Sequence, residues 1–369
     1  MNNKLFSKEA VNTGRQNEFD WAKAFTIIVM VTVHVYELLS VVDAENVPVE
    51  GVFRNVLEFL AGPLGAPLFM FSMGIGLIYS RNTTPSKMGI RGAKLIRNGY
   101  LLSFFKGTLP ILIGMALGIK SPYPVWDSLF LVSILQFAGM AFFTIALMKR
   151  FNFSLPAIFT TSILLSVIGT FLNTYSMGGW KQYFLGLFFM TNKITSFPLF
   201  LWLYYPAAGM IFAYFLQRVT DKKKFYTWCF IISLIGLVLT CVIYSLCGIN
   251  LKSMYELYNR EFYTQSLLHY VFSTFVILIG MSVYYALSEL VKAKKVVNAV
   301  AFLGRNLDVI YIVQWIVVSY TTVVVVAAKL PKLELPYVLP VGIVLLLVSV
   351  GITKLYLDIK KKHTKTKSA

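Results

Sequence analysis

Long apolar runs, separated by short polar segments, recur along almost the whole chain. Each run is close to the roughly 20 residues that an α-helix needs to cross the hydrocarbon core of a bilayer. The segment 180–191 is shorter and is expected to lie at the interface or to re-enter the membrane without crossing it. The pattern predicts an all-α, polytopic transmembrane helical bundle of about ten spans. These are residues 21–42, 62–80, 99–119, 127–148, 155–175, 197–217, 226–248, 266–290, 306–328 and 337–357.

Positive charge gathers in every second connector between these runs. Because Lys and Arg are kept on the cytoplasmic side of membrane proteins, the alternation and the even number of spans predict that both termini are cytoplasmic. The chain then divides into a cytoplasmic segment 1–20, a membrane domain 21–357 and a basic cytoplasmic tail 358–369. The basic connectors are 81–98, 149–154, 218–225 and 291–305, whereas the connector 43–61 holds Asp43, Glu45, Glu50 and Glu58 against Arg54 alone.

Composition agrees with a membrane protein and disfavours other classes. Of the 369 residues, 57% are hydrophobic and only 14% are charged, whereas a soluble domain is roughly one quarter charged. The net charge of +18 does not indicate nucleic-acid binding, because the basic residues form short clusters beside apolar runs, where they face anionic lipid. The cysteines match neither a disulfide framework nor a zinc site, so no metal is expected; they are Cys229, Cys241 and Cys247.

The first apolar run carries His34 and Glu37 near its far end. Counted from Asp20 at ~1.5 Å per residue, His34 lies ~21 Å deep, past the bilayer midplane. Ionisable groups at this depth are costly and usually have a function. Glu37, at i+3, shares a helix face with His34. A carboxylate there would fix the imidazole tautomer and raise the basicity of the other ring nitrogen, as a general base requires. The alternative is a histidine satisfied by a neighbouring helix.

Several other polar groups inside or beside the apolar runs have competing explanations. Lys106 either snorkels to the interface or faces an anionic ligand. Asp308 either pairs with Arg305 or binds substrate. The basic connector 81–98 is either a topology signal or a cytoplasmic site for a polyanionic donor such as a coenzyme A, whose phosphates favour Arg and Lys. The candidate residues of this site are Arg91, Lys94 and Arg97.

Five stretches, taken together and in order, resemble a known family. The first is Arg15-x-x-Glu18-x-Asp20, followed by an apolar run that ends in His34-x-Tyr36. The others are residues 65–82, 133–143, 197–218 and 302–315. They resemble the heparan-α-glucosaminide N-acetyltransferase-like family of integral-membrane acyltransferases. The wider superfamily includes bacterial O-acyltransferases of surface polysaccharides, so the resemblance implies a bacterial cytoplasmic membrane.

This resemblance implies acetyl transfer from cytosolic acetyl-CoA to a sugar on the far side of the membrane, through a histidine in a central cavity. His34 would be the general base or a transient acyl carrier. The catalytic residues would be His34, Glu37 and Asp20. The acetyl-CoA would be bound by Arg15, Lys23, Arg91, Lys94 and Arg97. The acceptor would be bound by Trp202, Asn306, Asp308, Tyr311 and Gln314.

The chain also departs from the family pattern at four places. Lys23-Ala24 replaces Arg-Gly, Leu201 replaces Pro, Leu307-Asp308 replaces Ser-Leu, and Gln314 stands near an expected histidine. Two alternatives to an acyltransferase therefore stay open. One is a glycan or lipid transporter, or flippase, with a His–Glu proton relay, and the other is a catalytically inactive homologue. Partners expected for the acyltransferase are acyl-CoA, a carbohydrate acceptor and membrane lipid; a homo-oligomer is compatible with these features.

Overall fold

The computed structural model describes residues 5–42, 51–81, 83–120, 124–174, 178–191, 195–257 and 261–366. Within these ranges the chain is helical, and β-structure is limited to isolated bridges. Three acidic residues of the first connector, Asp43, Glu45 and Glu50, lie outside the described residues.

The first half of the chain forms eight α-helices and a π-helical segment. They are α1 (Asn17–Leu39), α2 (Val52–Ala61), α3 (Ala66–Tyr79), α4 (Pro85–Ser103), η1 (Phe104–Thr108), α5 (Leu109–Ala116), α6 (Val125–Leu129), α7 (Ile134–Arg150) and α8 (Leu155–Asn173). The second half forms α9 (Lys181–Leu185), α10 (Leu199–Trp202), α11 (Tyr204–Leu216), α12 (Lys222–Leu246), η2 (Leu251–Met254), η3 (Glu261–Tyr263), α13 (Leu267–Leu290), α14 (Lys294–Arg305), α15 (Leu307–Ala327) and α16 (Leu335–Thr366).

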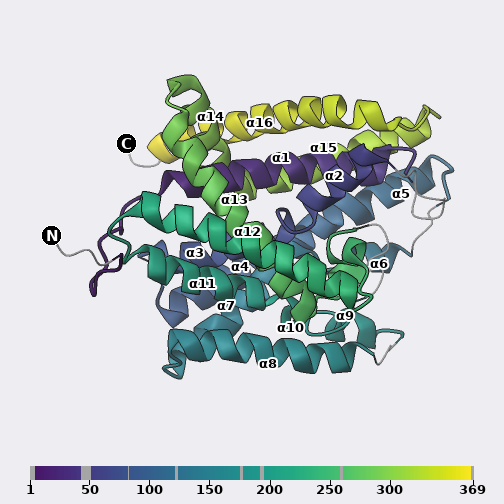
Figure 1. Ribbon diagram of the computed structural model, residues 1–369. Helices are drawn as coiled ribbons and strands as arrows, with labels where there is room; N and C mark the ends of the chain where they lie inside the picture. The colour runs from purple at the N-terminus through teal and green to yellow at the C-terminus, as the bar shows by residue number, and fades with distance from the viewer. Residues whose placement is uncertain are drawn as a thin grey trace.

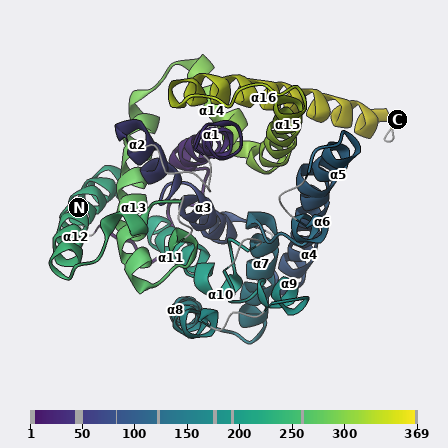
Figure 2. The same ribbon diagram turned by 90° about the vertical axis from the view of Figure 1, so that its right-hand side faces the viewer.

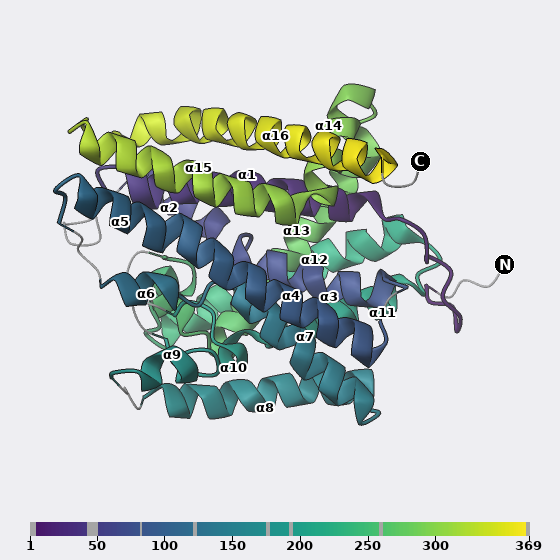
Figure 3. The same ribbon diagram turned by 180° about the vertical axis from the view of Figure 1, so that it is seen from behind.

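Nine stretches of the described chain are long and apolar enough to cross a membrane. Three of them join consecutive helices: α2 with α3, α4 with η1 and α5, and α10 with α11. The predicted span 127–148 instead begins in the short α6 and continues as α7, a helix of only 17 residues that packs along α4. The start of α1 and the end of α16 lie at the same end of the bundle (Figures 1 and 3). The predicted polytopic helical bundle is confirmed, and the protein is an integral membrane protein.

Three segments predicted to be connectors are helical instead. The acidic connector contains α2, the basic connector 81–98 is largely α4, and the connector 291–305 is largely α14. Lys and Arg are good helix formers, and Pro85 at the first turn of α4 suits a helix start. Polar composition therefore marks where these helices leave the hydrocarbon and does not mark where they end.

Helix α1 lies at the centre of the bundle. Seen along the helices, it is enclosed by its neighbours (Figure 2), and it packs against α2, α3, α13, α14, α15 and α16. Ala22, Ile27, Val31 and Val35 are fully buried although they point in different directions around the helix. A helix that is apolar on most sides belongs in the interior, and His34 is buried with the rest of α1, whereas Glu37 near its end is exposed.

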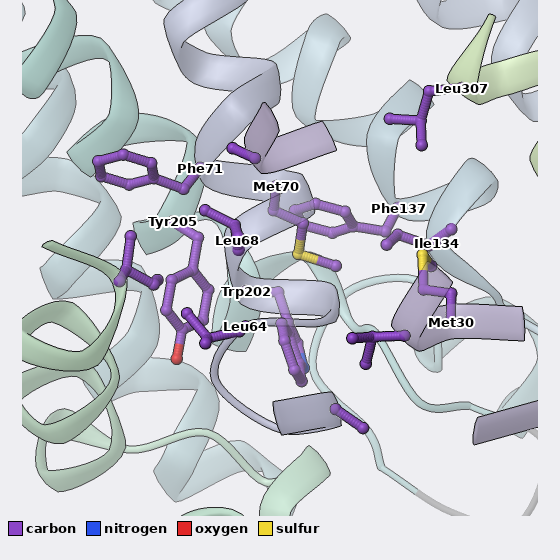
Figure 4. Close-up of a cluster of buried hydrophobic side chains, with 14 of the residues drawn as sticks. Met30, Leu64, Leu68, Met70, Phe71, Ile134, Phe137, Trp202, Tyr205 and Leu307 are labelled. Carbon is purple, nitrogen blue, oxygen red and sulfur yellow. The ribbon is translucent and has the colours of Figure 1, made fainter. Parts of the chain in front are cut away.

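Close packing of α3 on α11 builds the wall beside α1. A Cβ atom at Gly74 would meet the carbonyl oxygen of Pro206 at 1.9 Å, and one at Gly209 would meet that of Phe71 at 2.0 Å. Glycine at both positions lets the two backbones touch, as is common between membrane helices. Figure 4 shows part of the buried apolar core, in which side chains of α3, α7, α10 and α11 lie together with Met30 of α1 and Leu307 of α15.

Candidate functional site

The residues predicted to act together are divided between two cavities at opposite ends of α1. The first has a volume of about 230 Å³ and is lined by the segment 13–16, the first turns of α1 and one face of α3. The second has a volume of about 60 Å³ and is lined by the second half of α1, the turn between α2 and α3, and the segments around Phe197 and Phe262. The two cavities have no lining residue in common.

The first cavity is polar and carries an excess of positive charge. Nε of Arg15 donates to Oδ2 of Asp20 at 3.0 Å, and Nη2 of Arg15 donates to the same oxygen. Lys23 lies one turn further along α1, half-buried, within the fields of Asp20, Asp308, Arg91 and Arg15. The lining therefore holds two cations and one carboxylate, with Asp308 and Arg91 near enough to act on Lys23, an arrangement suited to an anionic ligand.

A buried ion pair behind this cavity anchors the start of α1. Glu18 is only 1% exposed, its Oε1 lies 2.6 Å from Nζ of Lys222, and it accepts a hydrogen bond from the Tyr226 hydroxyl at 3.1 Å. The Glu18 of the sequence motif is thus a structural residue that ties α1 to α12.

The basic residues of α4 do not line the first cavity. Arg91 lies closest, with its guanidinium 4.8 Å from the ring centroid of Phe142 and its charge acting on Lys23. Lys94 is exposed on the same helix. Arg97 is also exposed and donates to Oδ1 of its neighbour Asn98 at 3.1 Å. Of the three residues of α4 that were predicted to bind the coenzyme, only Arg91 lies near enough to act on Lys23 of the first cavity.

The junction between α14 and α15 packs directly on Asp20. A Cβ atom at Gly304 would meet the Asp20 Cα at 2.9 Å. The amide of Asn306 donates to the Phe302 carbonyl at 2.9 Å, and so fastens the end of α14. Asn306 and Asp308 therefore belong to the first cavity's end of the molecule, although both were predicted to bind the acceptor with Gln314.

His34 lines the second cavity and is held by Gln314, not by Glu37. Nδ1 of His34 lies 3.1 Å from Oε1 of Gln314, while Nε2 of Gln314 donates to the Tyr311 carbonyl at 3.2 Å. Since the amide nitrogen must face that carbonyl, the amide oxygen faces His34, and Nδ1 carries the ring proton. Nε2 of the ring is thereby left as a proton acceptor, the arrangement expected of a general base.

Glu37 is exposed on the rim of the second cavity, and its carboxylate acts on Lys106. The predicted orientation of His34 by Glu37 is therefore wrong: one turn of helix carries Glu37 outward, past the imidazole, whereas Gln314 reaches His34 from α15. Gln314, which stands near the position where the resemblance led us to expect a histidine, is the residue that contacts His34.

The indole ring of Trp315 contacts both His34 and Lys106. The His34 and Trp315 ring centroids are 3.7 Å apart, and Nζ of Lys106 lies 3.5 Å from the Trp315 ring centroid. Sequence reasoning left the role of Lys106 open and missed Trp315. Trp315 directly follows Gln314 in the sequence, and this position could have indicated that it lies near the site.

Trp202 supports the second cavity from behind and does not line it. It is fully buried, and its indole N–H donates to the Tyr263 carbonyl at 3.1 Å. Its ring packs on Phe197, Phe262 and Tyr263, and all three of these line the cavity. Trp202 therefore acts on any ligand there only through its neighbours.

A buried ionic network at the far end of α1 was not predicted at all. Oε1 of Glu58 accepts from the Tyr36 hydroxyl at 2.8 Å and from Nε of Arg54 at 2.9 Å. Oε2 of Glu58 accepts from the Leu257 backbone N–H at 3.1 Å, and Nη2 of Arg54 donates to Glu256 at 2.6 Å. Because Leu257 lines the second cavity, the network fixes part of the wall of that cavity. The i, i+4 spacing of Arg54 and Glu58 was a usable signal.

Comparison with known proteins gives one match. A family model described as an acyltransferase domain matches residues 16–354, from the segment before α1 into α16. No curated protein and no solved structure matches the chain. Within the described residues, no cluster of three or more His, Cys, Asp or Glu side chains is placed to hold a metal ion.

Proposed function

We propose that this chain, which belongs to the acyltransferase domain family, moves an acetyl or similar short acyl group from an acyl-CoA to a hydroxyl or amine of a carbohydrate. The donor's phosphates would lie at the first cavity, with Arg15 and Lys23. The acceptor would lie at the second cavity, beside His34. The membrane would be a bacterial cytoplasmic membrane, with the first cavity on its inner side and a cell-envelope glycan as acceptor.

The observation that carries this proposal is the state of His34. Oε1 of Gln314 lies at Nδ1 of His34, and His34 lines the second cavity; these two contacts support a role for Nε2 as the base. In the proposed step, Nε2 takes the proton from the acceptor as its oxygen or nitrogen attacks the thioester carbonyl. The new bond to the carbonyl carbon forms, the carbon–sulfur bond breaks, and the departing thiolate receives the proton from His34.

The spacing of the two cavities supports transfer along α1. Lys23 and His34 are 11 positions apart in one helix, about 16 Å at 1.5 Å per residue. An extended pantetheine arm is long enough to join a phosphate site at Lys23 to a thioester at His34. A proton relay, the basis of the transporter alternative, is less well supported, because His34 is paired with a neutral amide and not with Glu37.

Binding of acetyl-CoA to the purified protein in lipid nanodiscs, measured by calorimetry, tests the donor site without knowledge of the acceptor. A charge-assisted hydrogen bond is worth about 1.5–3 kcal/mol, so Lys23→Ala should weaken binding by about 10- to 100-fold. Lys354→Ala is the matched control, because Lys354 is an exposed lysine of α16 within a membrane span. No saturable binding up to millimolar acetyl-CoA would contradict the proposal and leave the inactive homologue.

A further inference from the structure

Gly76 is the only exposed residue of α3, a helix that belongs throughout to the described chain. Its neighbours Ile75 and Leu77 are only 2% and 3% exposed. A Cβ atom at Gly76 would meet no packed neighbour within 4 Å among the described residues. In the same helix, a Cβ atom at Gly74 would strike the carbonyl oxygen of Pro206. Packing between helices therefore explains the glycine at Gly74 but does not explain the one at Gly76.

A glycine in the interior of a helix requires a physical reason. Glycine destabilises a helix interior relative to alanine, and it is used there where another backbone or a ligand approaches the helix closely. Gly76 has no such backbone beside it among the described residues, and it lines the first cavity with main-chain atoms alone. Close approach of a ligand to the backbone of α3 is the reason that is left.

The first cavity combines bare backbone with aromatic rings. Gly14, in the segment before α1, also lines it, and a Cβ atom there would likewise meet no packed neighbour within 4 Å in the described part of the chain. Phe19 and Tyr79 line the cavity from α1 and α3, with ring centroids 5.5 Å apart and ring planes at 77°. Bare backbone lets a ligand approach closely, and aromatic side chains are the surfaces that nucleic-acid bases favour. These surfaces suit a flat, uncharged ring system.

The direction of the donor along α1 decides which part of it reaches α3. In coenzyme A the diphosphate joins the pantetheine arm to adenosine, so with phosphates at Arg15 and Lys23 and the arm directed toward His34, adenosine occupies the rest of the first cavity. The cavity volume of about 230 Å³ is below the roughly 300–1,000 Å³ of a pocket for a whole drug-sized ligand, and so suits one part of the coenzyme. We propose that Gly76 is a specificity-determining residue of the donor site, and that the adenine ring of the acyl-CoA lies against the α3 backbone at Gly76, beside Tyr79. This inference rests on the proposed function.

The test is calorimetric binding of acetyl-CoA and of its two halves to the protein in nanodiscs. Adenosine 3′,5′-bisphosphate carries the base without the arm, and 4′-phosphopantetheine carries the arm without the base. Gly76→Leu should weaken acetyl-CoA and the bisphosphate by about 5- to 150-fold, the equivalent of one stacked base, and leave 4′-phosphopantetheine within about threefold. The thermal midpoint should stay unchanged or rise, because leucine is the better helix former and meets no packed neighbour. Gly351→Leu is the matched control and should change no affinity, because Gly351 is exposed inside α16 with the same open space and lines neither cavity.

The outcomes separate this inference from the proposed function. A wild type that binds no acetyl-CoA would overturn the donor site itself. With acetyl-CoA bound by the wild type, the role of Gly76 alone would be overturned by wild-type affinities in Gly76→Leu, by equal weakening of both halves, or by a bisphosphate that does not bind. A lowered thermal midpoint would also overturn it, because the space at Gly76 would then be filled by the protein. Should Gly76→Leu not be recovered folded, Gly76→Ala supplies the test: its methyl group should weaken the bisphosphate by at least about fivefold, as overpacking of a close contact does, and a wild-type affinity would overturn the inference.

Discussion

Replacement of Glu58 by Gln should strongly destabilise the protein. Glu58 is 1% exposed and accepts hydrogen bonds from Tyr36, Arg54 and the Leu257 backbone N–H. Removal of one member of a buried ion pair costs about 3–5 kcal/mol, because the partner charge remains buried. Arg54 keeps its contact with Glu256 at 2.6 Å, so we expect the lower end of that range, about 3 kcal/mol.

The assay is thermal unfolding of the purified protein in one detergent, with an exposed ion pair as the control. Nζ of Lys292 lies 3.7 Å from Oε2 of Glu289, and the side chains of Glu289 and Lys292 are 59% and 68% exposed. Exposed pairs of this kind contribute about 0–1 kcal/mol, so Glu289→Gln should leave the unfolding midpoint nearly unchanged. Equal small shifts for Glu58→Gln and Glu289→Gln would refute the claim that the network is buried and coupled.

A double variant tests the same reasoning from the other side. Arg54→Met alone leaves the Glu58 carboxylate without its main cation, whereas Arg54→Met with Glu58→Leu removes both charges together. Replacement of a whole buried pair by apolar residues is often neutral. The double variant should therefore unfold at a higher temperature than either single variant, although the Tyr36 hydroxyl loses its acceptor. Additive losses would show that the two residues act independently.

Two further predictions concern Gln314 and Gly304. Gln314→Leu should lower kcat by about tenfold, because it removes a buried hydrogen bond worth about 1 kcal/mol and with it the tautomer of His34. Gln314→Glu should retain activity. Steady-state kinetics would check both variants, and a fully active Gln314→Leu variant would contradict the prediction. Gly304→Ala should cost about 1–3 kcal/mol, since its Cβ would lie 2.9 Å from the Asp20 Cα. Gly351→Ala, with open space around it, should not destabilise in the same unfolding assay.

The bundle could be predicted from the sequence because lipid imposes one rule at every position. Runs of about 20 apolar residues have few alternatives to a membrane helix, and nine of the predicted spans correspond to long apolar stretches of the described chain. The helices at the ends of spans could not be predicted in this way. The basic residues of α4 and α14 are equally compatible with a loop and with a helix that continues into the headgroups.

The candidate site was only half predictable. His34 and the charges at Asp20 stood out, because each is a rare polar residue in or beside an apolar run. The partner of His34 did not, because Gln314 lies 280 positions away on α15 and reaches the imidazole only through helix packing. Glu37 was favoured by its i+3 spacing, yet spacing within one helix says nothing about which neighbouring helix supplies a closer group.

The distance along one helix also explains why the residues predicted to bind the acceptor do not lie together. Asp308 and Gln314 are six residues apart in one helix, about 9 Å along its axis, so Asp308 acts on Lys23 whereas Gln314 contacts His34. Trp202, predicted to bind the acceptor, lies behind the wall of the second cavity, where its N–H is already bound to Tyr263. Which face of a helix is covered depends on packing that no single sequence displays.

The most direct test of the account is the transfer of radiolabelled acetyl from acetyl-CoA to carbohydrate by the wild type and by His34→Ala in proteoliposomes. General-base catalysis contributes about 10²- to 10⁴-fold. We predict labelled carbohydrate with the wild type, a loss of at least about 100-fold in kcat with His34→Ala, and an unchanged affinity of that variant for acetyl-CoA. Full transfer activity in His34→Ala would contradict the account.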